Sequence, residues 1–403
     1  MSTVICSVSG CNLSIICMYL EIYKYVYQSS STHNTSFVAY DSAEDKNVVS
    51  SPLSLMILLS LFNNGAGPVT KEEITQFLGG TDYQKVSYLS QKFSELNPEA
   101  LTVANKVYVS NNFRLQDSFT YAAQSYYSEV ENIDFSQSQQ AADIINQWAD
   151  EKTKGNIKKP VSPGVLGSDV AAALFNVIYF KGHWHVPFKS EETKDKDFHL
   201  NKSEVVQKPT MHLLQSLYYT ESPELGARVS VTLLLFSAGY SYKPYLLEKT
   251  FKSIGFRMVV VLPNEIDGLP SVLEKASQKG LLDDVFKLSP AGSDVDLDFP
   301  KFDVRSKLDF NEILPKLGVS KLFEEGASGI VQDQEVVVSK AFQEAFIKVD
   351  EEGATAGAFT GFVIMPISLN SQPPPPLKFT VDRPFLYLIL FEDKIIFAGT
   401  YQH

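Results

Sequence analysis

Residues 171–184, AAALFNVIYFKGHW, restrict the possible folds of this chain more than any other segment. They are too apolar and too rich in β-forming residues for a strand that has one face in water. Such a strand belongs in the middle of a sheet, where both of its faces are buried. The amide of Asn176 then needs a partner inside the protein, because an unpaired buried polar group costs free energy.

The other predicted strands and helices follow one another irregularly along the 403 residues. Strands are predicted at residues 104–110, 257–263 and 334–350, at residues 295–304 with a bend at Pro300, and in a final hairpin that turns at Glu392 and Asp393. Helices are predicted within residues 47–66, where Ser51 and Pro52 give a start signal, and at residues 70–79, 139–157 and 311–318. Strand and helix do not alternate regularly, which indicates an α+β fold and not a doubly wound sheet.

The charge balance and the cysteine positions exclude several classes of protein. The chain has 35 Lys and Arg against 47 Asp and Glu, a net charge of -12. This balance argues against a nucleic-acid or anionic-membrane surface, since both need clustered basic charge. The three cysteines, Cys6, Cys11 and Cys17, all lie near the N-terminus, so we expect no disulfide in the folded body.

The N-terminal segment, residues 1–36, is atypical and contains the one candidate for a targeting signal. Residues 4–20 carry no charge, as in the apolar part of a signal peptide, although a basic start is missing. We therefore expect a secreted, extracellular protein in preference to a cytoplasmic one. A membrane-spanning helix is not expected, because the apolar run is short and interrupted. Export would make the sequons at Asn34 and Asn201 relevant.

Residues 351–376, EEGATAGAFTGFVIMPISLNSQPPPP, separate two strongly predicted strands and have a different composition from the rest of the chain. Glycines and small residues at the start resemble a flexible linker, and four prolines at the end favour an extended backbone. A loop of this length is usually either functional or disordered. Composition alone leaves both interpretations open.

Five motifs occur in the order found in serpins: SSPLSL at Ser50, NVIYFKGHWHVPF at Asn176, RMVVVLPN at Arg257, LFEEGASGI at Leu322 and DRPFLYLILF at Asp382. The run KAFQEAFIKVDEEG before the unusual segment resembles the serpin hinge. The resemblance covers about residues 47–403. It implies a serpin domain at residues 37–403, with a large mixed sheet, surrounding helices and an exposed reactive-centre loop at about 351–376.

The resemblance also implies a function. Serpins inhibit serine proteases as suicide substrates: the protease cleaves the loop, becomes acylated, and the loop inserts into the largest sheet as an extra strand. We therefore expect a monomeric inhibitor without cofactor or metal. An enzyme is not expected, because nucleotide, metalloprotease and nucleophile-elbow motifs are missing and the histidines are irregularly spaced.

An inserting strand places alternate residues on a buried face, so every second side chain has to be small. The hinge begins with Glu351, Glu352 and Gly353, and the inward set is Ala354, Ala356, Ala358 and Thr360. No member of the inward set is bulky or charged, whereas the large Phe359 has the outward parity. The segment is therefore predicted to be able to insert.

Family spacing from Gly353 places the reactive bond between Ile367 and Ser368, with an uncertainty of one or two residues. A neutral branched residue such as Ile367 cannot pair with the acidic pocket of trypsin-like enzymes. An elastase- or chymotrypsin-like protease is therefore the expected target.

Five further residues match positions that serpins use to control opening of the sheet. Ser51, Ser54 and Asn176 match the polar region called the shutter, and Gln343 stands where many members have histidine. Trp184 matches the tryptophan near the top of the sheet, in the region called the breach. The alternative is that all five are ordinary buried polar and aromatic residues.

Two segments depart from the family pattern. Residues 37–45 stand in place of a long first helix, and residues 230–245 are predicted to be inserted before the strand at 257–263. These irregularities motivate the alternative function, a non-inhibitory serpin that acts as a carrier, a chaperone or a storage protein.

Overall fold

The computed structural model describes residues 47–78, 83–95, 101–181, 183–184, 186–235, 256–276, 290–351, 374–391 and 394–403. These residues form three sheets with helices packed around them, so the predicted α+β fold is confirmed. The N-terminal 46 residues and most of the predicted reactive-centre loop lie outside the described residues.

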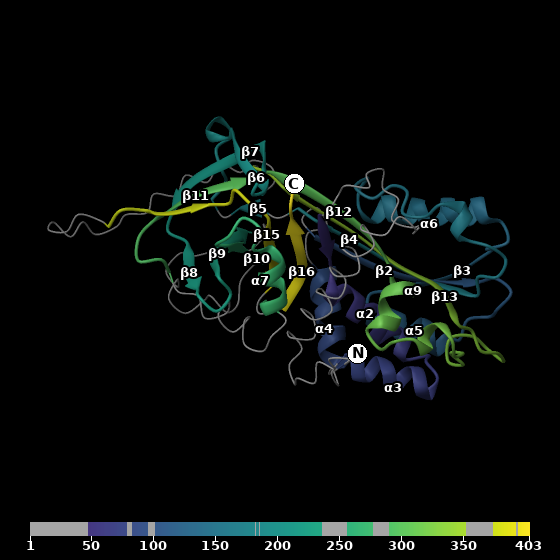
Figure 1. The fold of residues 1–403 in the computed structure, drawn as a ribbon. Coiled ribbons are helices and arrows are strands. Elements are labelled where there is room, and N and C mark those ends of the chain that lie inside the picture. Colours follow the sequence, from purple (N-terminus) through teal and green to yellow (C-terminus); the bar gives the residue numbers. More distant parts are fainter. Residues whose placement is uncertain are drawn as a thin grey trace.

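The five-stranded sheet extends from the middle of the molecule to its right-hand end in Figure 1. Its strands, in spatial order, are β12 (Phe302–Asp309), β13 (Val338–Val349), β4 (Ala172–Phe180), β2 (Leu101–Ser110) and β3 (Glu129–Ile133). The central pair, β13 and β4, is parallel, whereas β12 and β2 pair with them in antiparallel fashion. Every residue of β4 is buried, which confirms the prediction of a strand covered on both faces.

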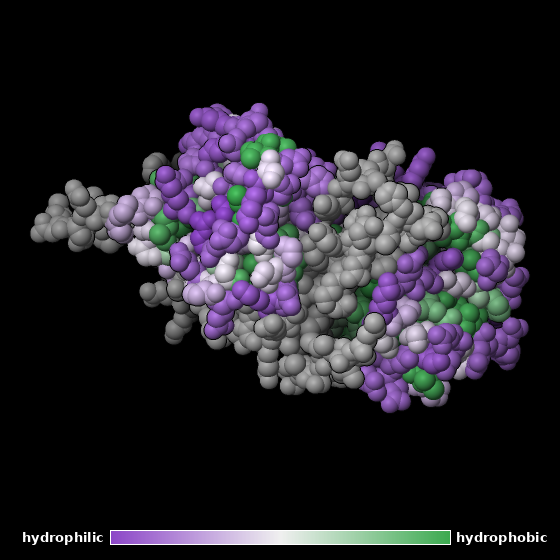
Figure 2. All heavy atoms as spheres, in the orientation of Figure 1, coloured by the Kyte–Doolittle hydropathy of each residue, from purple (hydrophilic) through white to green (hydrophobic). Residues whose placement is uncertain are grey.

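Two further sheets lie toward the other end of the molecule. One contains β1 (Val48–Ser50), β16 (Lys394–Tyr401), β15 (Phe385–Phe391), β10 (Phe256–Pro263), β9 (Ala227–Leu235) and β5 (His183–Trp184), with β8 (Tyr218–Ser222) beside β9. The other contains β14 (Leu377–Thr380), β11 (Val295–Pro300), β7 (Glu204–Gln215) and β6 (Lys194–Asn201). The surface over β6 and β7 is mainly hydrophilic (Figure 2).

The helices cover both faces of the five-stranded sheet. They are α2 (Pro52–Asn63), α3 (Pro68–Phe77), α4 (Tyr83–Ser94), α5 (Asp117–Ser125), α6 (Ser138–Lys152), α7 (Leu269–Ala276) and α9 (Phe310–Lys316), together with the short 3-10 helices η1 (Pro163–Val165), η2 (Ser190–Glu192) and η4 (Lys321–Phe323). Helix α2 is buried along its whole length and packs between the sheet and β16, whereas α6 covers the opposite face of the sheet. No helix in the described ranges is long and apolar enough to cross a membrane.

The start of α2 shows how the sequence sets the position of this helix. Ser51 adopts an extended backbone and its side chain accepts a hydrogen bond from the backbone N–H of Ser54, while Pro52 occupies the first helical position. The serine side chain satisfies one of the free backbone N–H groups at the helix N-terminus. Proline has no N–H, so at the first helical position it costs no helical hydrogen bond. The predicted start signal is therefore confirmed.

Two predicted strands, at residues 171–184 and 295–304, are each divided between two sheets. Ala172–Phe180 form β4, but His183 and Trp184 form β5 in the sheet of β9. Residues 295–304 were expected to form one bent strand, but β11 ends at Pro300 and β12 begins at Phe302 in a different sheet. Residues 230–235, at the start of the predicted insertion, form the end of β9 and pair with β10 as far as Leu234 opposite Phe256, and residues 236–245 lie outside the described residues. Proline ends the ladder of β11 because it has no N–H, and the apolar run of β9 is explained by its sheet partner.

Candidate functional site

The candidate site lies along the parallel pair β13 and β4 at the centre of the five-stranded sheet. Their ladder runs from Val338 opposite Ala172 to Ile347 opposite Phe180. Strand β13 then ends at Val349 and leads to Glu351, the last described residue before residue 374. The segment predicted as the reactive-centre loop therefore starts at the end of one of these two central strands.

A row of three buried side-chain amides crosses the sheet at one level. Asn105 on β2 lies opposite Asn176 on β4, which in turn lies opposite Gln343 on β13. Gln343 Nε2 donates to Asn176 Oδ1 at 2.8 Å, and Asn176 Nδ2 donates to Asn105 Oδ1 at 2.8 Å. We call these three residues the amide row. It adds side-chain hydrogen bonds to the backbone ladder between the two parallel strands.

The amide row also holds the beginning of α2. Gln343 Oε1 accepts a hydrogen bond from the backbone N–H of Ser51 at 2.9 Å, and Gln343 Nε2 donates to the Ser51 carbonyl at 3.0 Å. Asn176 Nδ2 donates to Ser54 Oγ. All members of this cluster are uncharged and almost fully buried, so their hydrogen bonds cannot be replaced by water without opening the core.

The structure thus brings together four of the residues singled out from the sequence, Ser51, Ser54, Asn176 and Gln343. It adds Asn105, which sequence reasoning missed. The signal was present, because an amide inside the predicted strand at residues 104–110 needs an internal partner for the same reason as Asn176.

Trp184 lies apart from the amide row, near the end of β13. Its Nε1 donates to the backbone carbonyl of Asp350 at 2.7 Å. Its ring packs edge-on against Phe188 and Phe299, with centroids 5.3 and 6.2 Å away. The indole therefore fixes the backbone immediately before the loop.

Both carboxylate oxygens of Glu351 are held at this point. Thr193 Oγ1 donates to Oε1 at 2.7 Å, and Lys301 Nζ donates to Oε2 at 2.6 Å. Burial by itself would raise the pKa of Glu351, but the hydrogen bonds from Lys301 and Thr193 and the charge of Lys301 hold the pKa below its usual value. Thr193 and Lys301 were not singled out from the sequence.

The remaining predicted residues lie outside the described residues, so the structure does not place them. They are the hinge residues Glu352, Gly353, Ala354, Ala356, Ala358 and Thr360, and the reactive-bond residues Ile367 and Ser368.

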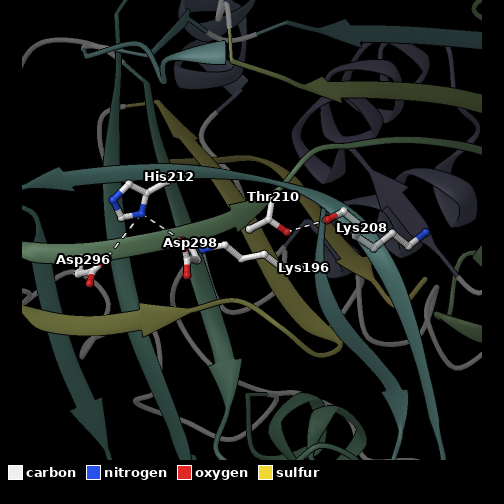
Figure 3. A network of polar contacts seen from close by, with 6 residues as sticks. All are labelled: Lys196, Lys208, Thr210, His212, Asp296 and Asp298. Atoms are coloured by element: carbon white, nitrogen blue, oxygen red, sulfur yellow. Dashed lines mark hydrogen bonds and ion pairs between the residues drawn. The ribbon is translucent and has the colours of Figure 1, made fainter. Parts of the chain in front are cut away.

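The chain returns through β14 to the four-stranded sheet, whose outer face carries a second polar network (Figure 3). Asp298 Oδ1 accepts hydrogen bonds from Lys196 Nζ at 2.6 Å and from His212 Nδ1 at 3.1 Å. His212 Nδ1 also lies 3.5 Å from Asp296 Oδ1. These contacts connect β6, β7 and β11, the other three strands of the sheet that contains β14. Among the described residues no group of three or more His, Cys, Asp and Glu side chains is arranged to hold a metal ion.

Comparison with known proteins gives a uniform result. The family model described as Serpin (serine protease inhibitor) matches residues 35–403. Alaserpin from Manduca sexta is 32% identical over 309 residues, which are 74% of this chain and 72% of the relative. Antitrypsin from Bombyx mori is 31% identical over 363 residues, 88% of each chain. The solved structure of Serpin48 from Tenebrio molitor matches with a TM-score of 0.75 at 32% identity and covers 97% of each chain.

Proposed function

This chain belongs to the serpin family, and from that premise we propose that it inhibits a serine protease as a suicide substrate. The family model and named relatives such as antitrypsin describe protease inhibitors and not enzymes. In our proposal the protease cleaves the segment after Glu351 near Ile367 and Ser368 and becomes acylated. The cleaved loop then enters the five-stranded sheet between β13 and β4.

The observation that carries this proposal is the parallel arrangement of β13 and β4 beside the origin of the loop. A segment that leaves the end of β13 and folds back between the two strands runs antiparallel to both. One parallel pairing is thereby replaced by two antiparallel pairings, which are slightly more stable per residue. Each added ladder hydrogen bond contributes about 0.5–1.5 kcal/mol net, so insertion is favourable over a dozen bonds.

The side chains between the strands oppose insertion only weakly. Separating β13 from β4 breaks the hydrogen bond between Gln343 and Asn176. It also parts one of the two strands from the start of α2, because Gln343 binds Ser51 while Asn176 binds Ser54. A single neutral hydrogen bond contributes about 1 kcal/mol. The amide row therefore supports the closed sheet but does not prevent its expansion.

The small inward set of the hinge supports the same proposal. Ala354, Ala356, Ala358 and Thr360 can face the core of an expanded sheet without overpacking it. Ile367 at the reactive bond favours an elastase- or chymotrypsin-like target, because its neutral side chain suits an apolar pocket. We further propose that the inhibitor is monomeric and acts outside the cell, with residues 4–20 as part of the export signal.

The test is to mix the purified chain with pancreatic elastase and, separately, with chymotrypsin, and to run denaturing gels. We expect a band at the summed mass of inhibitor and protease, because an acyl-enzyme survives denaturation. Sequencing the released C-terminal peptide identifies the cleaved bond. Complete cleavage by both enzymes without such a band would instead support the non-inhibitory carrier, chaperone or storage function.

A further inference from the structure

The hairpin between β6 and β7 carries the sequence Asn201-Lys202-Ser203. This is the acceptor pattern Asn-X-Ser, with a residue other than proline in the middle, that N-glycosylation requires. It is the one such pattern within the described residues. Lys202 and Ser203 are exposed and Asn201 is partly exposed, so the pattern lies at the surface and not in the core.

The side chain of Asn201 is held in a defined orientation. The backbone N–H of Ser203 donates to Asn201 Oδ1 at 2.9 Å, which forms a local Asx-type turn. Asn201 Nδ2 donates to Glu204 Oε2 at 3.2 Å. An amide nitrogen carries two hydrogens, so this contact uses one of them and the other remains available for replacement.

We propose that Asn201 is an N-glycosylation site. This inference rests on the export that forms part of the proposed function. The co-reactant is an oligosaccharide joined through its reducing-end C1 to a lipid pyrophosphate. Asn201 Nδ2 forms a bond to that C1 carbon, the bond from C1 to the phosphate oxygen breaks, and the lipid pyrophosphate leaves. The nitrogen loses one proton to a base in the solvent and keeps the other, so the hydrogen bond from Asn201 Nδ2 to Glu204 can persist.

Asn201 lies far from the point at which the chain enters β14. Asn201 lies shortly before Glu204, the first residue of β7. The last residue of β7, Gln215, pairs with Val295 of β11, which in turn pairs with Leu377 of β14. Strand β7 has 12 residues, and a rise of about 3.3 Å per residue gives a separation of roughly 35 Å. A glycan on Asn201 would therefore lie at the opposite end of the four-stranded sheet from Leu377.

A glycan at this hairpin would also have a physical benefit. The hairpin ends β6, which is an edge strand of the four-stranded sheet in the described residues. Val205 beside the pattern is 48% exposed, an unusual position for a branched apolar side chain. Exposed edge strands with apolar residues are sites of intermolecular pairing. A bulky, hydrophilic group at Asn201 would hinder such pairing.

The test uses the full chain expressed in a eukaryotic cell line with an active secretory pathway. The wild type is compared with Asn201→Gln, Ser203→Ala and Ser203→Thr, and with Asn264→Gln as a matched control, since Asn264 is an exposed asparagine outside any acceptor pattern. Tryptic peptides from the medium are analysed by mass spectrometry before and after treatment with peptide N-glycosidase. Peptide mapping separates Asn201 from the other acceptor patterns of the chain, at Asn12 and Asn34.

We expect a glycopeptide that contains Asn201 in the wild type, in Ser203→Thr and in Asn264→Gln, and its loss in Asn201→Gln and Ser203→Ala. Recovery of the unmodified peptide from secreted wild-type protein would overturn the proposal, and so would retention of the full chain in the cytoplasm. Protease inhibition is measured separately on purified wild type and Asn201→Gln, which we expect to inhibit equally. Failure of the glycosylation proposal is thereby distinguished from failure of the proposed inhibition.

Discussion

The side-chain amide of Gln343 binds both backbone polar groups of Ser51: Oε1 accepts from the Ser51 N–H and Nε2 donates to the Ser51 carbonyl. A neighbouring β-strand would satisfy these two groups in the same way. Because Gln343 belongs to β13 and Ser51 caps α2, one side chain connects the central sheet to its most deeply buried helix. The same Nε2 also reaches Asn176 on the adjacent strand.

Replacement of Gln343 by leucine tests the importance of these contacts. The substitution leaves the N–H of Ser51 and the Oδ1 of Asn176 without their partner in a buried environment, while the Ser51 carbonyl keeps the hydrogen bond from the Leu55 N–H. Unsatisfied buried groups cost about 1–3 kcal/mol each, so we expect Gln343→Leu to lower the free energy of unfolding by at least about 2 kcal/mol. Urea unfolding provides the measurement. Lys348→Ala, at an exposed position of the same strand, is the control and should change stability by less than about 1 kcal/mol.

The contacts of Glu351 with Thr193 and Lys301 predict a pH-dependent difference in stability between the wild type and Glu351→Gln. Because the pKa of Glu351 is lowered in the folded protein, the ionised carboxylate adds stability above the ordinary glutamate pKa, about 4.3. This contribution is lost as the pH falls through the lower folded-state value. Glu351→Gln should therefore be less stable than the wild type by on the order of 1 kcal/mol at pH 7, a modest value because Lys301 is partly exposed.

The thermal midpoints of the wild type and Glu351→Gln should converge as the pH falls below about 4. Lys301→Met should remove most of the difference at pH 7, because it deletes the charge that favours the carboxylate. An undiminished difference between the two proteins at low pH would show that the glutamine substitution acts through packing and not through the charge.

Trp184→Phe tests the attachment of the backbone before the loop. The substitution removes the hydrogen bond to the Asp350 carbonyl but retains an aromatic ring against Phe188 and Phe299. We expect a loss of about 1 kcal/mol and faster cleavage of the loop by a non-target protease. Trp148→Phe is the matched control, because Trp148 Nε1 has no hydrogen-bond partner among the described residues. Equal effects on loop cleavage would contradict the special role of Trp184.

The alternation of inward and outward residues in the hinge gives a prediction about protease trapping. A charge at the inward position Ala356 would be buried in the expanded sheet, whereas a charge at the outward position Thr355 would remain in water. Ala356→Asp should therefore be cleaved as a substrate with little complex formed, while Thr355→Asp should still trap the protease. Stoichiometry of inhibition, measured by titration, distinguishes the two. Full trapping by Ala356→Asp would contradict insertion in this register.

Local sequence patterns were sufficient for several elements but not for the contacts between them. The apolar run around Asn176 predicted a strand covered on both faces, and Ser51 with Pro52 predicted the start of α2, because both signals depend on neighbouring residues only. The need of Asn176 for an internal partner was also predictable.

The identity of the partners was not predictable, since it depends on the register between distant strands. Asn105 and Gln343 come to the level of Asn176 only once three strands are aligned. Thr193 and Lys301 likewise meet Glu351 from segments that are distant in the sequence. The change of sheet after Pro300 was missed for the same reason, because an alternating pattern does not show which sheet a strand joins.

The central claim, that the cleaved loop becomes a strand between β13 and β4, is tested most directly by the thermal stability of the loop-cleaved protein. The intact chain is cut near Ile367 with a protease that does not form a complex, and both forms are heated while circular dichroism is recorded. We expect the cleaved form to unfold at least about 10 °C higher, because a dozen new ladder hydrogen bonds add on the order of 10 kcal/mol. An unchanged or lower midpoint after complete cleavage would contradict insertion and with it the proposed mechanism of inhibition.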